Sequence, residues 1–141
     1  MVEDVTRCAV WPAYSFWRIY RHGSRLKRHV DRPSCEISMS IHLGGDGPWS
    51  LWVQSRGGEE IALELAPGDA VFYQGCELPH WRETYEGHEY FQVFLHYVRK
   101  DGKCAPHKFD DRIGLGLPSK HRIMDVIRQR RSKVEPLPPQ P

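Results

Sequence analysis

The sequence predicts an all-β fold, a double-sheet jelly roll, followed by a short C-terminal helix. Two observations carry this prediction. Short segments of alternating apolar and polar residues recur between residues 13 and 99, and clusters of glycine and proline separate them with no helical pattern in between. Eight short strands at regular spacing are typical of two packed antiparallel sheets.

The first three predicted strands flank the most informative polar residues. Residues 13–21 are rich in aromatic and β-branched types, and a second strand over 26–31 ends before Arg32-Pro33-Ser34. Residues 35–43 alternate most clearly, which predicts a half-buried strand. Its apolar positions are Ile37, Met39, Ile41 and Leu43, and its polar positions are Glu36, Ser38, Ser40 and His42.

Five further strands complete the predicted jelly roll, over residues 49–54, 59–66, 70–73, 78–85 and 89–99. Beyond them, Ser119 is expected to cap a helix that runs to about Lys133. We therefore expect a catalytic core over 1–100, a loop and helix over 101–135 packed on or beside it, and a disordered tail over 136–141.

Composition narrows the class of protein. The 141 residues suit one domain, and 20 basic against 18 acidic side chains give a net charge of +2, which does not favour nucleic acid as a partner. The four cysteines are scattered without a Cys-x-x-Cys pair, so we expect reduced thiols in a cytoplasmic protein. No apolar run approaches the ~20 residues of a membrane span, and no signal peptide is expected.

A His-x-Asp tripeptide is the strongest functional signal. In an extended segment His29 and Asp31 project from the same face and can bind one metal ion together, although a solvated charged pair is the alternative. His80, in a later strand, is the best candidate for a third ligand. His88 is its main rival and is expected at the surface, whereas His96 is expected to be a hydrogen-bonded interior residue. Two histidines and one carboxylate form the facial triad of non-heme iron(II) oxygenases.

These residues and their order carry a family resemblance. The segment 28–33 (RHVDRP), the strand over 35–43, Pro67-Gly68-Asp69, and His80 ahead of the last strand resemble the core of the 2-oxoglutarate- and Fe(II)-dependent dioxygenases, closest to the prolyl-hydroxylase-like branch. The resemblance covers residues 14–98 and implies a double-stranded β-helix. It also implies that Fe(II) is bound by His29, Asp31 and His80, with 2-oxoglutarate as cosubstrate.

The implied reaction consumes dioxygen and 2-oxoglutarate and hydroxylates an unactivated C–H bond, with succinate and carbon dioxide as co-products. The resemblance does not identify the substrate, which could be a small molecule or a protein side chain.

The chain departs from this family where a basic residue binds the 5-carboxylate of 2-oxoglutarate. About ten residues after the distal histidine, the sequence reads His88-Glu89-Tyr90. Arg82 is a substitute, because it lies two residues beyond His80 on the same face and guanidinium suits bidentate binding of a carboxylate. Its alternative role is an exposed strand cation. Arg18 and Tyr20 are further candidates for binding the cosubstrate.

Two other classes remain open. The same residues loosely resemble the metal motifs of cupins, in which case Glu36 would be a fourth ligand and the protein a metal-dependent enzyme or small-molecule binder that does not use 2-oxoglutarate. A jelly-roll binding module with an incidental triad is the third class. Uncovered strand edges would allow a homodimer.

Overall fold

The computed structural model describes residues 1–118, so the helix expected over 119–133 and the tail expected over 136–141 lie outside the described residues. The elements are α1 (Val2–Thr6), β1 (Val10–Arg21), β2 (Leu26–His29), η1 (Pro33–Cys35), β3 (Ile37–Gly45), β4 (Leu51–Gln54), β5 (Glu60–Leu63), β6 (Ala70–Tyr73), β7 (His80–Arg82), β8 (Glu89–Arg99) and η2 (Ala105–Asp111).

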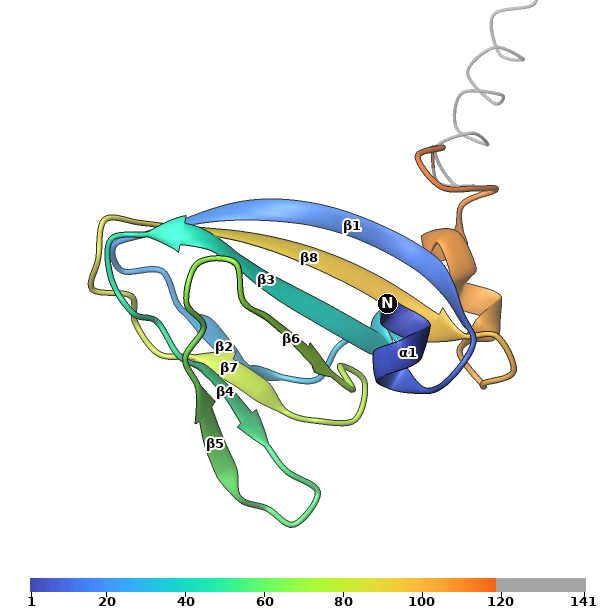
Figure 1. The fold of residues 1–141 in the computed structure, drawn as a ribbon, viewed down its shortest axis with the longest axis horizontal. Coiled ribbons are helices and arrows are strands. Elements are labelled where there is room, and N and C mark those ends of the chain that lie inside the picture. The colour runs from blue at the N-terminus through green and yellow to red at the C-terminus, as the bar shows by residue number, and fades with distance from the viewer. Residues whose placement is uncertain (119–141) are drawn as a thin grey trace, which may run out of the picture.

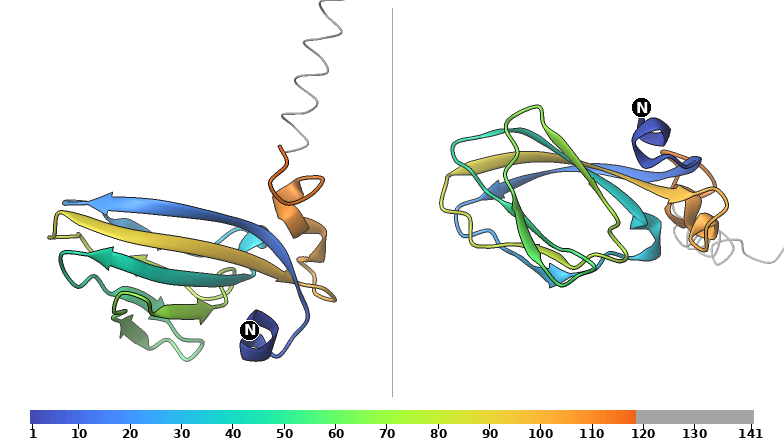
Figure 2. Two further views of the ribbon diagram at one scale, coloured as in Figure 1. Left: turned by 45° about the horizontal axis from the view of Figure 1, so that its top comes forward. Right: turned by 60° about the horizontal axis from the view of Figure 1, so that its bottom comes forward.

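The described strands form two four-stranded antiparallel sheets that face each other (Figures 1 and 2). The first sheet has the order β1-β8-β3-β6 and the second the order β2-β7-β4-β5. Strands distant in sequence thus become neighbours, as in a jelly roll. The predicted all-β, double-stranded β-helix is confirmed. Within residues 1–118, no helix is long and apolar enough to cross a membrane.

The strand boundaries differ from the prediction in instructive places. The strands over 70–73 and 89–99 begin and end where expected. The strand that carries His80 covers only three residues, and the one expected from residue 35 begins at Ile37. Pro33 explains the second difference, because its fixed backbone angle starts the short 3-10 helix η1 there. The N-terminal helix α1 was not predicted.

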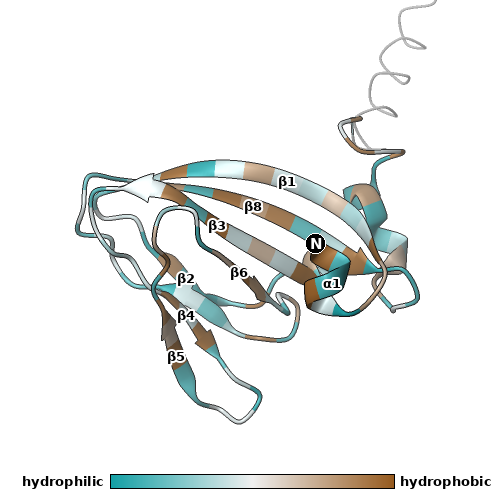
Figure 3. Cartoon of the chain, in the orientation of Figure 1, coloured by the Kyte–Doolittle hydropathy of each residue, from teal (hydrophilic) through white to brown (hydrophobic). Residues whose placement is uncertain are grey.

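The face of β3 that points into the molecule is its polar face. Ser38 and Ser40 are fully buried and His42 is 4% exposed. On the opposite face Ile37 and Met39 are also buried, whereas Leu43 is 56% exposed. Figure 3 shows the alternation of hydropathy along β3 and β8. The position of His42 near the end of its strand predicts a surface residue, and this prediction is wrong. Its ring stacks on Tyr90, with ring centroids 4.1 Å apart.

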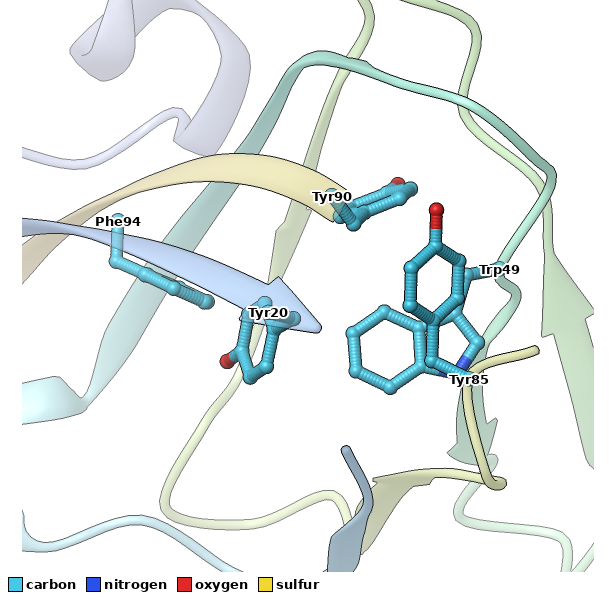
Figure 4. Packing of buried hydrophobic residues seen from close by; sticks show 5 residues of the cluster. All are labelled: Tyr20, Trp49, Tyr85, Tyr90 and Phe94. Atoms are coloured by element: carbon cyan, nitrogen blue, oxygen red, sulfur yellow. The ribbon is translucent and has the colours of Figure 1, made fainter. Parts of the chain in front are cut away.

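An aromatic cluster lies where β1 and β3 end and β8 begins (Figure 4). Trp49 is at its centre, with ring centroids 4.8 Å from Tyr20, 5.1 Å from Tyr85 and 5.5 Å from Tyr90. Phe94 completes the cluster. Each such ring contributes roughly 1.5–3 kcal/mol through burial. The cluster holds one end of the two sheets together and leaves the other end to the polar residues described below.

Candidate metal centre

The structure brings together the three residues that the sequence predicts as metal ligands. His29 ends β2, His80 begins β7, and the two residues lie opposite each other in the pairing of these strands, with ring centroids 4.4 Å apart. Asp31 follows in the loop, where its backbone N–H donates to the Gly75 carbonyl at 2.8 Å. Ligand atoms of His29, Asp31 and His80 all lie within 4.8 Å of one another.

Backbone contacts orient both imidazole rings. Nδ1 of His29 lies 2.7 Å from the Lys27 carbonyl oxygen, and Nδ1 of His80 lies 2.9 Å from that of Leu78. A carbonyl oxygen only accepts, so each Nδ1 donates a hydrogen and each Nε2 keeps a free lone pair. These Nε2 atoms lie 3.5 and 3.6 Å from the same oxygen, Oδ1 of Asp31. Three free ligand atoms thus face a common point.

Asp31 is held in its ionised form. Burial raises the pKa of this carboxyl, but when His80 is protonated its hydrogen bond and its charge, together with the hydrogen bond from Ser38, outweigh burial, so the pKa lies below its ordinary value. The side chain of His29 is 38% exposed, whereas that of His80 is 3% exposed. An ion placed here would have protein on one side and an accessible approach on the other.

The donor set fits a divalent first-row metal ion. Two neutral imidazole nitrogens and one ionised carboxylate oxygen are the ligands that Fe(II) accepts, and they leave coordination positions free. The rival ligand His88 is exposed on the loop before β8, as expected. His96 is buried and hydrogen-bonded to Ser38, also as expected.

Arg82 is buried, so the alternative role of an exposed cation is wrong. It is 1% exposed, and its guanidinium lies over the rings of Trp49 and Tyr90, at 4.7 and 5.1 Å. One guanidinium nitrogen donates to the Trp49 carbonyl, and the other, Nη2, has no partner among the described residues. No carboxylate of residues 1–118 forms an ion pair with it, and burial lowers the pKa of Arg82.

Three other buried polar atoms, at buried positions of β3 and β8, also lack hydrogen-bond partners within the described chain. They are Oη of Tyr90, Oε1 of Gln92 and Nε2 of His42. Leaving a polar atom buried and unpaired costs about 1–3 kcal/mol, so this grouping suits a polar ligand. Of the other candidates, Tyr20 is buried in the aromatic cluster, and the exposed Arg18 lies over its ring at 4.9 Å.

Glu36 is not brought to the metal centre. Its carboxylate accepts a hydrogen bond from the Arg99 backbone N–H at 2.8 Å and lies 3.5 Å from the Arg99 guanidinium. It belongs neither to the group of His29, Asp31 and His80 nor to the second group of potential metal ligands among the described residues, which is Asp31, Cys35 and His96. The fourth ligand that a cupin-type site requires is therefore engaged elsewhere.

Sequence reasoning missed the roles of three residues around Asp31, which are Ser38, Gly75 and His96. Ser38 donates to Asp31, and His96 contacts Ser38. The polar face of the third strand contained the signal for Ser38, because a polar face on a strand with an apolar opposite face can line an interior site. Nothing in the sequence marks Gly75, which the chain brings to Asp31 only in three dimensions.

Comparison with known proteins finds matches among solved structures, whereas no family model and no curated protein matches. A prolyl-4-hydroxylase from Pseudomonas putida is 24% identical, with a TM-score of 0.53, over 60% of this chain and 50% of that chain. An oxidoreductase of the 2OG-Fe(II) oxygenase family from Burkholderia pseudomallei is 22% identical, with a TM-score of 0.61, over 72% of this chain and 51% of that chain.

A third match is the nickel complex of a non-heme monooxygenase, ThoJ, which is 10% identical with a TM-score of 0.59, over 93% of this chain and 65% of that chain. Cupin domains also match, three of them with TM-scores of 0.41, 0.40 and 0.37. The chain spans about half the length of the first two structures. At these identities the likeness establishes the fold alone, and the chain shares the two-sheet β fold of the three oxygenases.

Proposed function

We propose that this protein is a 2-oxoglutarate- and Fe(II)-dependent oxygenase that hydroxylates an unactivated C–H bond of a small-molecule or protein substrate. The observation that carries the proposal is the convergence of His29, Asp31 and His80 with their free ligand atoms turned to one point. Ligands on one side of an ion leave the remaining positions open for a cosubstrate and dioxygen.

The iron and 2-oxoglutarate would supply the redox chemistry, in which one oxygen atom of O2 enters the substrate and the other enters succinate, with release of carbon dioxide. The protein binds and orients. His29 and His80 keep their Nε2 lone pairs toward the ion because backbone carbonyls hold their Nδ1 hydrogens. Asp31 supplies a negative charge that its low pKa maintains at neutral pH.

Arg82 is the proposed partner of the 2-oxoglutarate 5-carboxylate. A buried guanidinium without a carboxylate partner has a strong preference for an anionic ligand, which it can bind through two N–H groups. It lies two residues beyond His80 along β7, a rise of about 7 Å, which suits the length of a five-carbon diacid. Tyr20 and Arg18 are proposed further contacts near this end.

The test is an anaerobic titration of 2-oxoglutarate into the Fe(II)-loaded protein. A chelated 2-oxo acid gives a weak visible charge-transfer band, which we expect in the unmodified protein and not in Asp31→Ala. Arg82→Met should need a much higher concentration of 2-oxoglutarate to give the same band. His88→Ala, at an exposed histidine, is the matched control and should behave like the unmodified protein.

The alternatives predict other outcomes. Tight Fe(II) binding without the band would contradict the use of 2-oxoglutarate and favour a metal-dependent protein of another kind, such as a cupin-type enzyme. Absence of metal binding would contradict the whole proposal and favour a binding module.

A further inference from the structure

Asp31 has a second oxygen that does not face the two histidines. Oδ1 lies near both Nε2 atoms, whereas Oδ2 accepts a hydrogen bond from the Ser38 hydroxyl at 3.1 Å. Ser38 is fully buried on the inward face of β3. Its hydroxyl has one hydrogen and three neighbours, because it also lies 3.3 Å from the Cys35 carbonyl oxygen and 3.0 Å from Nδ1 of His96.

The state of His96 decides where the hydroxyl hydrogen goes. Nε2 of His96 is buried and has no partner among the described residues. A buried N–H without an acceptor is rarer in proteins than a buried lone pair without a donor, which favours the tautomer with the hydrogen on Nδ1. Nδ1–H then donates to the Ser38 oxygen, and the Ser38 hydrogen is left for Asp31. The three side chains form a chain of hydrogen bonds from β8 to the carboxylate.

Gly75 closes the other side of this carboxylate. A Cβ atom at Gly75 would lie 2.7 Å from the Ser38 hydroxyl and 2.5 Å from the Cys35 carbonyl oxygen, and it would meet Oδ2 of Asp31 as well. These distances are shorter than atoms tolerate, so only glycine fits. The same residue accepts the hydrogen bond from the Asp31 backbone N–H. The carboxylate is thus fixed by one hydroxyl and enclosed by one backbone turn.

We propose that Ser38, supported by His96 and enclosed by Gly75, is a positioning residue that makes Asp31 present a single oxygen to the metal ion. This inference rests on the metal centre proposed above and adds three residues to it. A carboxylate free to turn can occupy two coordination positions. With Oδ2 held by Ser38, the position needed by the second oxygen of a chelating 2-oxo acid stays open.

The test measures Co(II) binding to the purified protein by anaerobic calorimetry and by the visible spectrum of the bound ion. Loss of a residue that orients a ligand typically lowers metal affinity about 10–100-fold, which is the fall expected for Ser38→Ala. Ser40→Ala is the matched control. Ser40 is equally buried, lies two residues along the same face and is hydrogen-bonded to Gln92 of β8 as Ser38 is to His96. We expect it to keep the affinity within about twofold, because it lacks the contact with Asp31.

Two further variants keep the inference testable if Ser38→Ala does not fold. His96→Phe preserves a ring that packs against Tyr14 and Phe94 but cannot donate to Ser38, and we expect weaker Co(II) binding and an altered spectrum. Gly75→Ala should also weaken binding. Its control is Gly47→Ala, where an added Cβ meets no atom within 4 Å.

The possible failures are distinguishable. If Asp31→Ala binds Co(II) as tightly as the unmodified protein, the metal centre itself is wrong. If Asp31→Ala loses Co(II) but Ser38→Ala and His96→Phe bind it as Ser40→Ala does, the metal centre stands and the positioning role is overturned.

Discussion

The two ends of the space between the sheets differ in whether their polar atoms have hydrogen-bond partners within the chain. At the metal end, His29, His80 and Asp31 each have one atom bonded to a neighbour in the chain and one atom free toward the centre. At the aromatic end, Arg82 and Tyr90 have buried polar atoms with no partner in the described chain. Arg82 of the aromatic end lies two residues from His80 of the metal end, a rise of about 7 Å along β7.

This difference separates two kinds of binding site. The metal end is preorganised, because hydrogen bonds to carbonyls and to Ser38 set the direction of every ligand before an ion arrives. The aromatic end lacks a partner for its buried charge. The free-energy cost of burying the Arg82 guanidinium is compensated only when an anion binds to it. The two needs match the two ends of a chelating 2-oxo diacid, one for a metal and one for a cation.

The largest expected effect is the loss of a ligand at the metal end. Asp31→Ala, His29→Ala and His80→Ala should each lower Co(II) or Fe(II) affinity at least about 100-fold and abolish turnover, since an orienting contact alone accounts for about 10–100-fold. The β fold should persist. Thermal unfolding with and without excess Co(II) measures the effect, because saturating metal stabilises the folded state by about 2.7 kcal/mol at one hundred times its dissociation constant.

Retention of the metal-induced shift in His80→Ala would show that another group, His96 first, completes the centre. His96 would then be a metal ligand as well as the residue that supports Ser38, and the metal end would be less fixed than proposed. His88→Ala again serves as the control, because this side chain is exposed and belongs to no group of potential metal ligands found among residues 1–118.

At the aromatic end, Arg82→Met should separate ligand binding from folding. Losing two charge-assisted hydrogen bonds, each worth about 1.5 kcal/mol or more, should raise the 2-oxoglutarate dissociation constant about 100-fold or more. The stability of the ligand-free protein should change far less, since the lost contacts with Trp49 and Tyr90 are offset by removal of a buried charge. Urea unfolding and anaerobic titration measure the two quantities. A large loss of stability with unchanged affinity would make Arg82 a structural residue only.

A smaller effect is expected at His42. Phenylalanine preserves the stacking on Tyr90 but removes the hydrogen bond to the Leu65 carbonyl and the unpaired Nε2. Because Nδ1 donates to the Leu65 carbonyl, Nε2 can only accept. If Nε2 accepts from a water molecule that in turn donates to a carboxylate of 2-oxoglutarate, His42→Phe should weaken 2-oxoglutarate binding about fivefold, because one such bond is worth about 1 kcal/mol. Unchanged affinity would confine the cosubstrate site to Arg82 and its immediate neighbours.

Sequence reasoning found the three proposed metal ligands because local rules bring them together. The i, i+2 rule for extended chain puts His29 and Asp31 on one side, and the order of the strands puts His80 opposite. The rule holds although Asp31 lies just beyond the end of β2. The alternation of β3 was equally clear, but period two does not say which face turns inward. That orientation depends on what the second sheet presents, and here it presents histidines and an arginine.

The remaining features depend on long-range contacts. The alternation of residues around Arg82 does not show whether its side chain is exposed or buried. It is buried because the rings of Trp49 and Tyr90, from other parts of the chain, cover it. Glu36 had the residue type of a ligand, yet its neighbour in space is Arg99. Gly75 is required because the turn after β6 approaches Asp31 closely. The sequence of a turn does not show which distant residue the turn will contact.

The smallest expected effect concerns Asp46, which ties together the loops that close the aromatic end. Its carboxylate accepts hydrogen bonds from the backbone N–H groups of His88 and Glu89 and from the Tyr85 hydroxyl, at 2.8–3.0 Å. These bonds, that from His88 first, hold the pKa of Asp46 well below its ordinary 3.8. A carboxyl with a lowered pKa in the folded state stabilises the fold above the unfolded pKa, and this contribution is lost as the pH falls toward the folded pKa.

Asp46→Asn should therefore lower the free energy of unfolding at pH 7, and the difference from the unmodified protein should shrink progressively below about pH 4. Urea titrations at pH 7, 5 and 3.5 measure it, with Asp101→Asn in the turn after β8 as the control. A difference that stays constant across this range would mean that the charge of Asp46 does not stabilise these loops. The aromatic end would then be closed by its rings alone, and the contrast with the hydrogen-bonded metal end would be sharper.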